Sequence, residues 1–130
     1  MSENFHLEII SPDQTLIKSE VKQVTIPAFE GLMTILKDHI SLVTFLRPGF
    51  IEAKIENNIE KFYVEEGTVE FFKNNLLILS STTKKKKNFL TDDARKMLDA
   101  CQKKLNKNDL EDKEKYILSY KIEALKEISH

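Results

Sequence analysis

The chain has 130 residues, of which 41% are hydrophobic and 32% are charged, a composition that suits one globular domain with a small appendage. It contains no apolar run of about 18 residues, so no membrane-spanning helix is expected, and its first residues lack the features of a signal sequence. Cys101 is the single cysteine, which excludes an internal disulfide and favours a reducing compartment. We therefore expect a soluble, cytosolic protein.

The net charge of −1 hides an asymmetry along the chain. Residues 1–83 carry seven Lys and Arg against twelve Asp and Glu, a net charge of −5. Residues 84–130 carry thirteen against nine, a net charge of +4. The two parts should therefore attract partners of opposite sign.

Apolar and polar residues alternate through the first 83 residues. The alternation is clear at Phe5, Leu7 and Ile9, and it returns in four later runs. Alternation of this kind is typical of half-buried strands. All three prolines and all three glycines also lie in this part, mostly where the runs end. The pattern predicts an N-terminal antiparallel β-sandwich of about eight to ten short strands over residues 1–84.

Local signals place turns and core positions within this sandwich. The pairs Asn57-Asn58 and Asn74-Asn75 separate alternating runs, and asparagine tolerates positive φ, so each pair predicts a hairpin turn. Gly31 and Gly49 are expected where the backbone needs positive φ. Four residues are expected in the core: Met33, Ile35, Leu42 and Leu46.

The period changes from 2 to about 3.6 after the four consecutive lysines at positions 84–87. The apolar stripe Ala94, Met97, Leu98, Cys101 and Leu105 predicts an amphipathic helix, capped by Thr91 or Asp92. A second helix is expected to follow, capped by Asp109 and running to about residue 128. Residues 85–130 thus predict a C-terminal antiparallel two-helix hairpin, which completes an α+β fold.

No catalytic chemistry is visible in the chain. His6, His39 and His130 are far apart and lack partners at metal-ligand spacing, and three scattered glycines exclude a phosphate-binding loop. Cys101 lies on an apolar stripe and is expected to be buried. The lysine run has no interleaved aromatic residues, so we interpret it as a solvated linker and expect no nucleic-acid partner. We expect no enzyme activity, no metal and no cofactor.

The order and spacing of several residues resemble those of a known protein family. Over residues 27–49 the chain has Glu30-Gly31, then an Ile-Leu pair, His39, an apolar run and Pro48-Gly49. In order and spacing these residues resemble the epsilon subunits of F-type ATP synthases of bacteria. Residues 66–70 resemble the family's Gly-Gly turn, except that Glu66 replaces the first glycine. The resemblance covers essentially the whole chain.

The resemblance implies a non-catalytic rotor subunit at the cytoplasmic face of the bacterial inner membrane. Its sandwich would join the gamma subunit to the c-ring, and Glu30, Gly31 and His39 would face these partners. Its hairpin would extend to the catalytic beta subunits, and to alpha, and inhibit ATP hydrolysis. If that docking is electrostatic, Lys103, Lys104 and Lys107 are the candidate residues, because they cluster near the end of the first helix, where positive charge also suits the helix dipole.

Some members of the family bind ATP through a box at the start of the first helix. Here residues 91–96 keep Asp92 and Arg95 of that box, but Thr91 and Lys96 depart from it, and no arginine follows Arg95. ATP binding is therefore expected to be weak or absent. Two other classes remain open: a free-standing β-sandwich interaction module and, less favoured, a small hydrolase.

Overall fold

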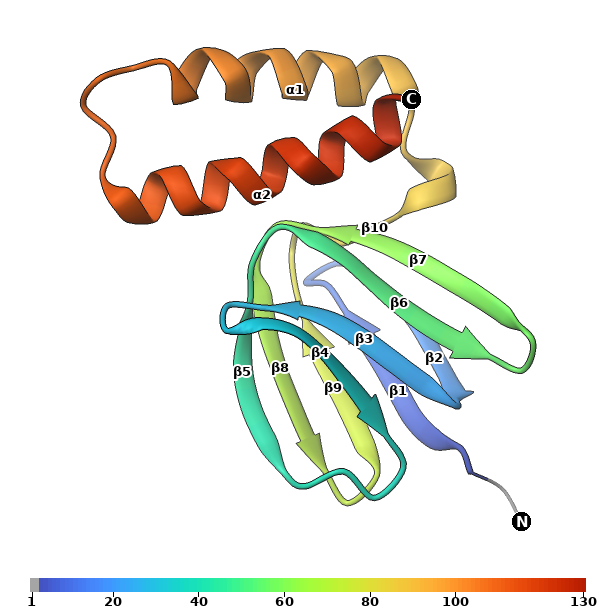
Figure 1. Cartoon of the computed structure of the whole chain (residues 1–130). Helices are drawn as coiled ribbons and strands as arrows, with labels where there is room; N and C mark the ends of the chain where they lie inside the picture. The colour runs from blue at the N-terminus through green and yellow to red at the C-terminus, as the bar shows by residue number, and fades with distance from the viewer. Residues whose placement is uncertain (1–2) are drawn as a thin grey trace.

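The computed structural model describes residues 3–130, and it has ten strands, a short 3-10 helix and two α-helices. Figure 1 shows the strands together in one unit and the two helices lying across one end of it. The strands are β1 Phe5–Ile10, β2 Thr15–Val21, β3 Gln23–Ala28, β4 Gly31–Leu36, β5 Leu42–Leu46, β6 Gly49–Ile55, β7 Asn58–Val64, β8 Gly67–Phe72, β9 Asn75–Leu79 and β10 Lys84–Lys85. The helices are η1 Lys86–Asn88, α1 Thr91–Leu105 and α2 Asp112–Ser129.

The strands form two layers that face each other. One layer has the order β10-β7-β6-β3-β4, and the other has the order β5-β8-β9-β1-β2. The layers meet where β3 pairs with β5 at Ala28 and Leu46. Neighbouring strands are antiparallel except for β1 and β9, which are parallel. The predicted sandwich followed by a helical hairpin is confirmed, and within residues 3–80 the structure contains strands and turns but no helix.

The alternating residues fill the space between the layers. Phe5, Leu7 and Ile9 are at most 1% exposed, whereas the residues between them are half-buried. Ile35 and Leu46 are buried as predicted, while Met33 and Leu42 are only partly buried and pack against the core. A period of two places successive side chains on opposite faces of a strand, so the sequence pattern and the core coincide.

Both asparagine turns lie one residue earlier than predicted. The first turn is formed by Glu56 and Asn57, and Glu56 is the residue with positive φ, at 56°. The second is formed by Lys73 and Asn74, with φ of 47° and 61°, as in a type I′ hairpin. Cross-strand register fixes the turns here, because Ile55 pairs with Asn58 and Phe72 with Asn75, which leaves two residues in each loop.

Gly31 and Gly49 require glycine for different physical reasons. Gly31 has a φ of 135°, so the prediction of positive φ is confirmed there. At Gly49 it is wrong, because this φ is not positive. Glycine is required at Gly49 by close packing instead, since an added Cβ would lie 2.8 Å from the Cβ of Pro27.

The predicted helix caps are wrong. Helix α1 starts at Thr91 itself, and its N-cap residue is Leu90, so neither Thr91 nor Asp92 stands at the capping position. Helix α2 starts at Asp112, and its N-cap residue is Glu111, two residues later than the predicted cap Asp109. Neither N-cap side chain makes a capping hydrogen bond. Packing of the apolar faces therefore determines where these helices begin, rather than a side-chain cap.

The hairpin lies against the sandwich through α2. Helices α1 and α2 pack on each other, and α2 contacts β6. Among the described residues, neither helix is long and apolar enough to span a membrane.

The packing of Gly67 yields a test of the fold. An added Cβ would lie 2.6 Å from the backbone oxygen of Leu79, which cannot move without disturbing the β8–β9 pairing. We expect Gly67→Ala to lower the free energy of unfolding by about 1–3 kcal/mol. Urea unfolding followed by circular dichroism measures this. The neighbouring Thr68→Ser, at an exposed position, should change stability by less than about 0.5 kcal/mol; equal stability of Gly67→Ala and Thr68→Ser would contradict the prediction.

Candidate functional site

The turn between β3 and β4 carries two of the predicted interface residues, Glu30 and Gly31. The hydroxyl of Thr44 donates to both carboxylate oxygens of Glu30, at 3.1 and 3.0 Å. The positive φ of Gly31 turns the chain back into β4. The carboxylate is thus held in a fixed position at this end of the sandwich.

His39 lies in the loop at the other end of β4. Its Nδ1 donates to the carbonyl oxygen of Ile40 at 2.8 Å, and its ring meets that of Phe71 edge to face. The preceding Asp38 ties this loop to the β8–β9 turn, because its N–H donates to the Asn74 Oδ1 at 2.7 Å and the Asn74 Nδ2 donates back at 2.9 Å. Six residues of strand, about 20 Å, separate Glu30 from His39. The structure therefore places the predicted interface residues at two separate sites.

A second hydrophobic core joins the hairpin to the sandwich. It is separate from the core between the two sheets, and its strand residue is Tyr63 on β7. Cys101 is 4% exposed within it, so the predicted burial is confirmed, and this burial raises the pKa of the thiol. The buried members are Tyr63, Ala94, Cys101, Ile122, Ala124, Leu125 and Ile128.

Tyr63 adds a hydrogen bond to this core. Its hydroxyl donates to the Glu65 Oε2 at 2.9 Å, and the Nζ of Lys121 on α2 lies 3.3 Å from the same oxygen. Burial, reinforced by the Glu65 carboxylate, raises the pKa of Tyr63 well above its usual range, so the hydroxyl stays protonated and can donate. One carboxylate of the sandwich therefore binds both a buried tyrosine and a lysine of the hairpin.

In a second contact the carboxylate belongs to the hairpin, on α2, and the lysines belong to the sandwich and the linker. The Glu127 Oε2 lies 2.8 Å from the Nζ of Lys61 on β7 and 2.9 Å from the Nζ of Lys86 in η1. The hydrogen bond from Lys61, followed by that from Lys86, holds the pKa of Glu127 below its usual value. This carboxylate connects the end of the hairpin to both the sandwich and the linker.

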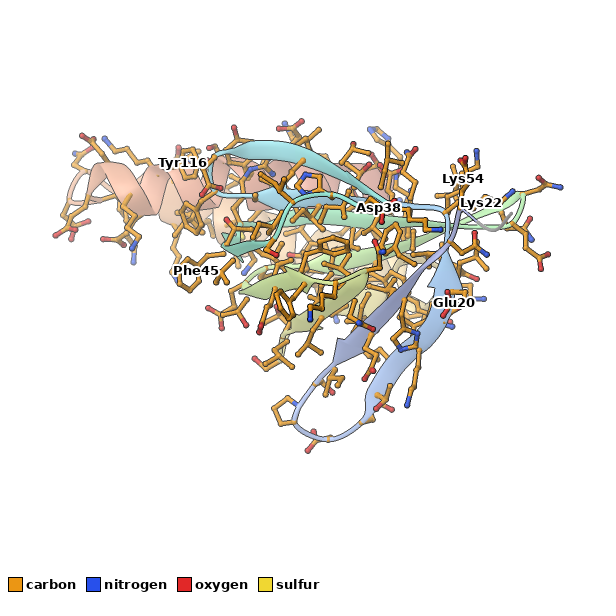
Figure 2. All side chains as sticks on the ribbon, turned by 90° about the horizontal axis from the view of Figure 1, so that it is seen from below. Glu20, Lys22, Asp38, Phe45, Lys54 and Tyr116 are labelled. Atoms are coloured by element: carbon orange, nitrogen blue, oxygen red, sulfur yellow. The ribbon has the colours of Figure 1, made fainter. Side chains whose placement is uncertain are left out.

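A third contact was not predicted from the sequence; we call it the tyrosine contact. It consists of Tyr116 and Tyr120 on α2 with Phe29 and Arg47 on the sandwich. The Tyr116 hydroxyl donates to the carbonyl oxygen of Phe29 at 2.6 Å, and the two rings are stacked. The Arg47 guanidinium lies 3.7 Å from the centre of the Tyr120 ring. Figure 2 shows Tyr116 and Phe45 on the same side of the molecule, away from Lys22 and Lys54.

A signal for this contact was present in the sequence. Tyr116 and Tyr120 are four residues apart and so share one face of α2, where their rings meet at 4.9 Å. Arg47 is one of only two arginines in the chain. The spacing identifies a pair of rings, but no rule of spacing pairs Tyr116 with Phe29, which lies 87 residues earlier in the chain.

The predicted docking lysines are all exposed. Lys103 pairs with Asp99 one turn earlier at 3.1 Å, and Lys104 and Lys107 follow at the end of α1 and just beyond it. None of the three has an ion pair with the sandwich among the described residues. Lys104 also lines the open groove between the hairpin and the sandwich, together with Glu65 and Glu66.

The two residues kept from the ATP box pair with each other. Arg95 lies 3.6 Å from Asp92, and its Nη2 donates to the Ser129 carbonyl oxygen at 3.5 Å. An open groove of about 1550 Å³ lies elsewhere, between the hairpin and the sandwich. Its charged lining residues are three lysines and three glutamates: Lys104, Lys113, Lys121, Glu65, Glu66 and Glu114. Neither place gathers the unopposed cations that a triphosphate needs.

The fold and these contacts define a class of protein: a β-sandwich with a helical hairpin folded onto it. The sequence profile of the family "ATP synthase, Delta/Epsilon chain, beta-sandwich domain" matches residues 4–86. The chain is 39% identical to the ATP synthase epsilon chain of Pelagibacter ubique over 130 residues, covering 99% of this chain and all of that one. It is 38% identical to the epsilon chain of Sinorhizobium medicae over 68 residues, about half of each chain.

Two solved structures share the fold. A chain of the Euglena gracilis mitochondrial ATP synthase superposes with a TM-score of 0.81 over all of this chain and 84% of its own, at 19% identity. A chain of the Tetrahymena thermophila mitochondrial ATP synthase central stalk and c-ring gives 0.62, at 12% identity, over 96% of each. The chain belongs to the ATP synthase delta/epsilon family, and its sequence relatives are epsilon chains. It is a non-catalytic subunit.

The lowered pKa of Glu127 predicts a pH dependence. Stability from a lowered pKa is present above the ordinary value of 4.5 and is lost as the pH falls through the folded value. We therefore expect the melting temperature to fall below about pH 4.5, and less steeply in Glu127→Gln than in the parent. Thermal unfolding between pH 3 and 7 measures this. Glu123→Gln, at an exposed position of the same helix, is the control and should follow the parent curve; identical curves for the parent and Glu127→Gln would contradict the assignment.

The paired Asp92 and Arg95 predict weak nucleotide binding. A triphosphate would have to replace the carboxylate on Arg95, with only exposed lysines to assist. Titration calorimetry with MgATP should give no dissociation constant in the micromolar range or tighter. Arg95→Gln should leave the titration unchanged. A micromolar constant that Arg95→Gln abolishes would show that the box is functional.

Proposed function

We propose that this chain is the epsilon subunit of an ATP synthase rotor, with its two parts in different roles. Residues 1–84 join the gamma subunit to the c-ring at the cytoplasmic face of the bacterial membrane. Residues 85–130 form a regulatory hairpin that leaves the sandwich, reaches the catalytic beta subunits and alpha, and inhibits ATP hydrolysis.

One observation carries the regulatory part of the proposal. The hairpin rests on its own small core, while the core between the sheets contains no helix residue. The hairpin can therefore separate without opening the main core. The cost is the exposure of one limited apolar surface and the loss of a few polar contacts, a cost that a partner surface could offset.

The charges suggest how the extended hairpin binds. Lys103, Lys104 and Lys107 are exposed and make no ion pair with the sandwich among the described residues. They are available to an acidic surface, and contacts of exposed charges are weak singly and sensitive to salt. Glu30 with Gly31 at one end of β4, and His39 at the other, are proposed as separate contacts with gamma and the c-ring.

Charge reversal at the three lysines tests electrostatic inhibition. In Lys103→Glu/Lys104→Glu/Lys107→Glu, inhibition of ATP hydrolysis by the reconstituted catalytic head should weaken by about tenfold or more at low salt, and less at moderate salt. The matched control is Lys18→Glu/Lys22→Glu/Lys54→Glu, which reverses three charges on the sandwich and should leave inhibition intact. Equal loss in both variants would show a non-specific charge effect.

Deletion of residues 88–130 tests the division of roles. The shortened chain should lose inhibition but still bind gamma, because the core between the sheets is retained. Gamma binding by calorimetry and ATP hydrolysis by the head are the two measurements. Full inhibition by the shortened chain would place the inhibitory surface in the sandwich.

A further inference from the structure

We propose that the tyrosine contact links the position of the hairpin to the conformation of the β3–β4 turn, so that release of the hairpin and rearrangement of this turn are one equilibrium. This proposal rests on the proposed function in one respect: it assumes that release of the hairpin is the regulated step. A partner that binds Glu30 or Gly31 would then favour or oppose release without touching the hairpin.

The first half of the link is a hydrogen bond into the turn. Phe29 immediately precedes Glu30, and its carbonyl oxygen accepts from the Tyr116 hydroxyl at 2.6 Å. Its own N–H donates to the Phe45 carbonyl oxygen at 3.0 Å. The turn is therefore held by β5 on one side and by α2 on the other, and only the second of these is lost when the hairpin leaves.

The second half of the link is a covered cation. Arg47 is only 7% exposed although it is charged, and the ring of Tyr120 lies over its guanidinium. Its Nη1 donates to the Pro48 carbonyl oxygen at 3.0 Å, whereas its Nε has no hydrogen-bond partner in the described structure. The ring attracts the cation and the unpaired Nε opposes its burial, so the two effects partly cancel. Such a contact suits reversible release rather than permanent closure.

Both halves converge on the same segment of backbone. The Arg47 N–H donates to the Pro27 carbonyl oxygen at 2.9 Å, two residues before Phe29. Thr44, on the strand that leads to Arg47, donates to the Glu30 carboxylate. Movement of Arg47 on release would therefore reach Glu30 by two routes. One is the backbone hydrogen bond from Arg47 to Pro27, and the other is the hydrogen bond from the Thr44 side chain to the Glu30 carboxylate.

The single cysteine provides a reporter for release. Cys101 is 4% exposed, in the core that joins the hairpin to Tyr63, so its reaction with a thiol reagent follows the open fraction. The experiment uses the full chain without partners, at one pH near neutrality. Tyr116→Phe removes only the hydroxyl, and Cys101 should react about two- to tenfold faster. Tyr120→Phe is the matched control and should react at the parent rate, because the Tyr120 hydroxyl makes no hydrogen bond among the described residues while its ring is kept.

A second measurement tests the link itself. The amide resonances of Glu30, Gly31 and Thr44 are followed in a variant that opens the hairpin from a distance. Ile128→Ala serves this purpose, because Ile128 is buried in the second core about 12 Å along α2 from Tyr120. We expect these resonances to shift in Ile128→Ala, and also in Tyr120→Leu, which removes the ring over Arg47, each in proportion to Cys101 reactivity. Core resonances of β1 and β9 verify that each variant is folded.

Two results would overturn the proposal. Equal Cys101 reactivity in Tyr116→Phe and Tyr120→Phe would show that the Phe29 hydrogen bond does not hold the hairpin. Faster reaction in Ile128→Ala with unchanged Glu30 and Gly31 resonances would show that the hairpin opens independently of the turn. Both measurements use the isolated chain, so either failure leaves the proposed inhibition standing, and a failure of inhibition leaves the link standing.

Discussion

The position of the helical hairpin depends on the packing of helix α2 against Tyr63 of the sandwich. Leu125 on α2 is fully buried in this core, and Cys101 brings α1 into it. Without this surface neither helix could bury its apolar stripe except against the other, since isolated helices of 15 and 18 residues are marginal in water. The sandwich has no such need, because its own core lies between the sheets. The dependence between the two parts is therefore one-sided, which agrees with the proposed release of the hairpin.

The polar contacts at this interface set where the hairpin rests. The Glu65 carboxylate accepts a hydrogen bond from Tyr63 and forms an ion pair with Lys121. The Glu127 carboxylate forms ion pairs with Lys61 and Lys86. Apolar burial alone would tolerate sliding or rotation of α2, whereas these pairs are satisfied in one placement only. The three ion pairs are partly exposed and each contributes little free energy alone, so together they specify position more than they add stability.

Much of this arrangement was predictable because periodicity reports burial. The alternation at Phe5, Leu7 and Ile9 identified the sandwich, and the stripe through Cys101 identified α1. Details fixed by tertiary contacts were not predictable. The hairpin turns follow the register of the strands, and Gly49 is required by Pro27 from another strand. The resemblance named Glu30 and His39 together, yet β4 holds them apart, because sequence spacing along a strand does not show which end of the sheet each residue occupies.

The charge asymmetry of the chain has a more limited role in the folded protein than it has in the sequence. If net charge governed docking, the basic hairpin would rest on the acidic sandwich through its lysines alone. Instead the contacts run in both directions, with a hairpin lysine on Glu65 and a hairpin carboxylate on Lys61. Lys103 forms an ion pair with Asp99 within its own helix, and Lys104 and Lys107 have no ion pair among the described residues. Most of the excess positive charge therefore does not hold the hairpin on the sandwich, and these three lysines are exposed while the hairpin is docked. In the proposed function, these exposed lysines would attract an acidic partner before the hairpin is released, and release would then allow the close contact.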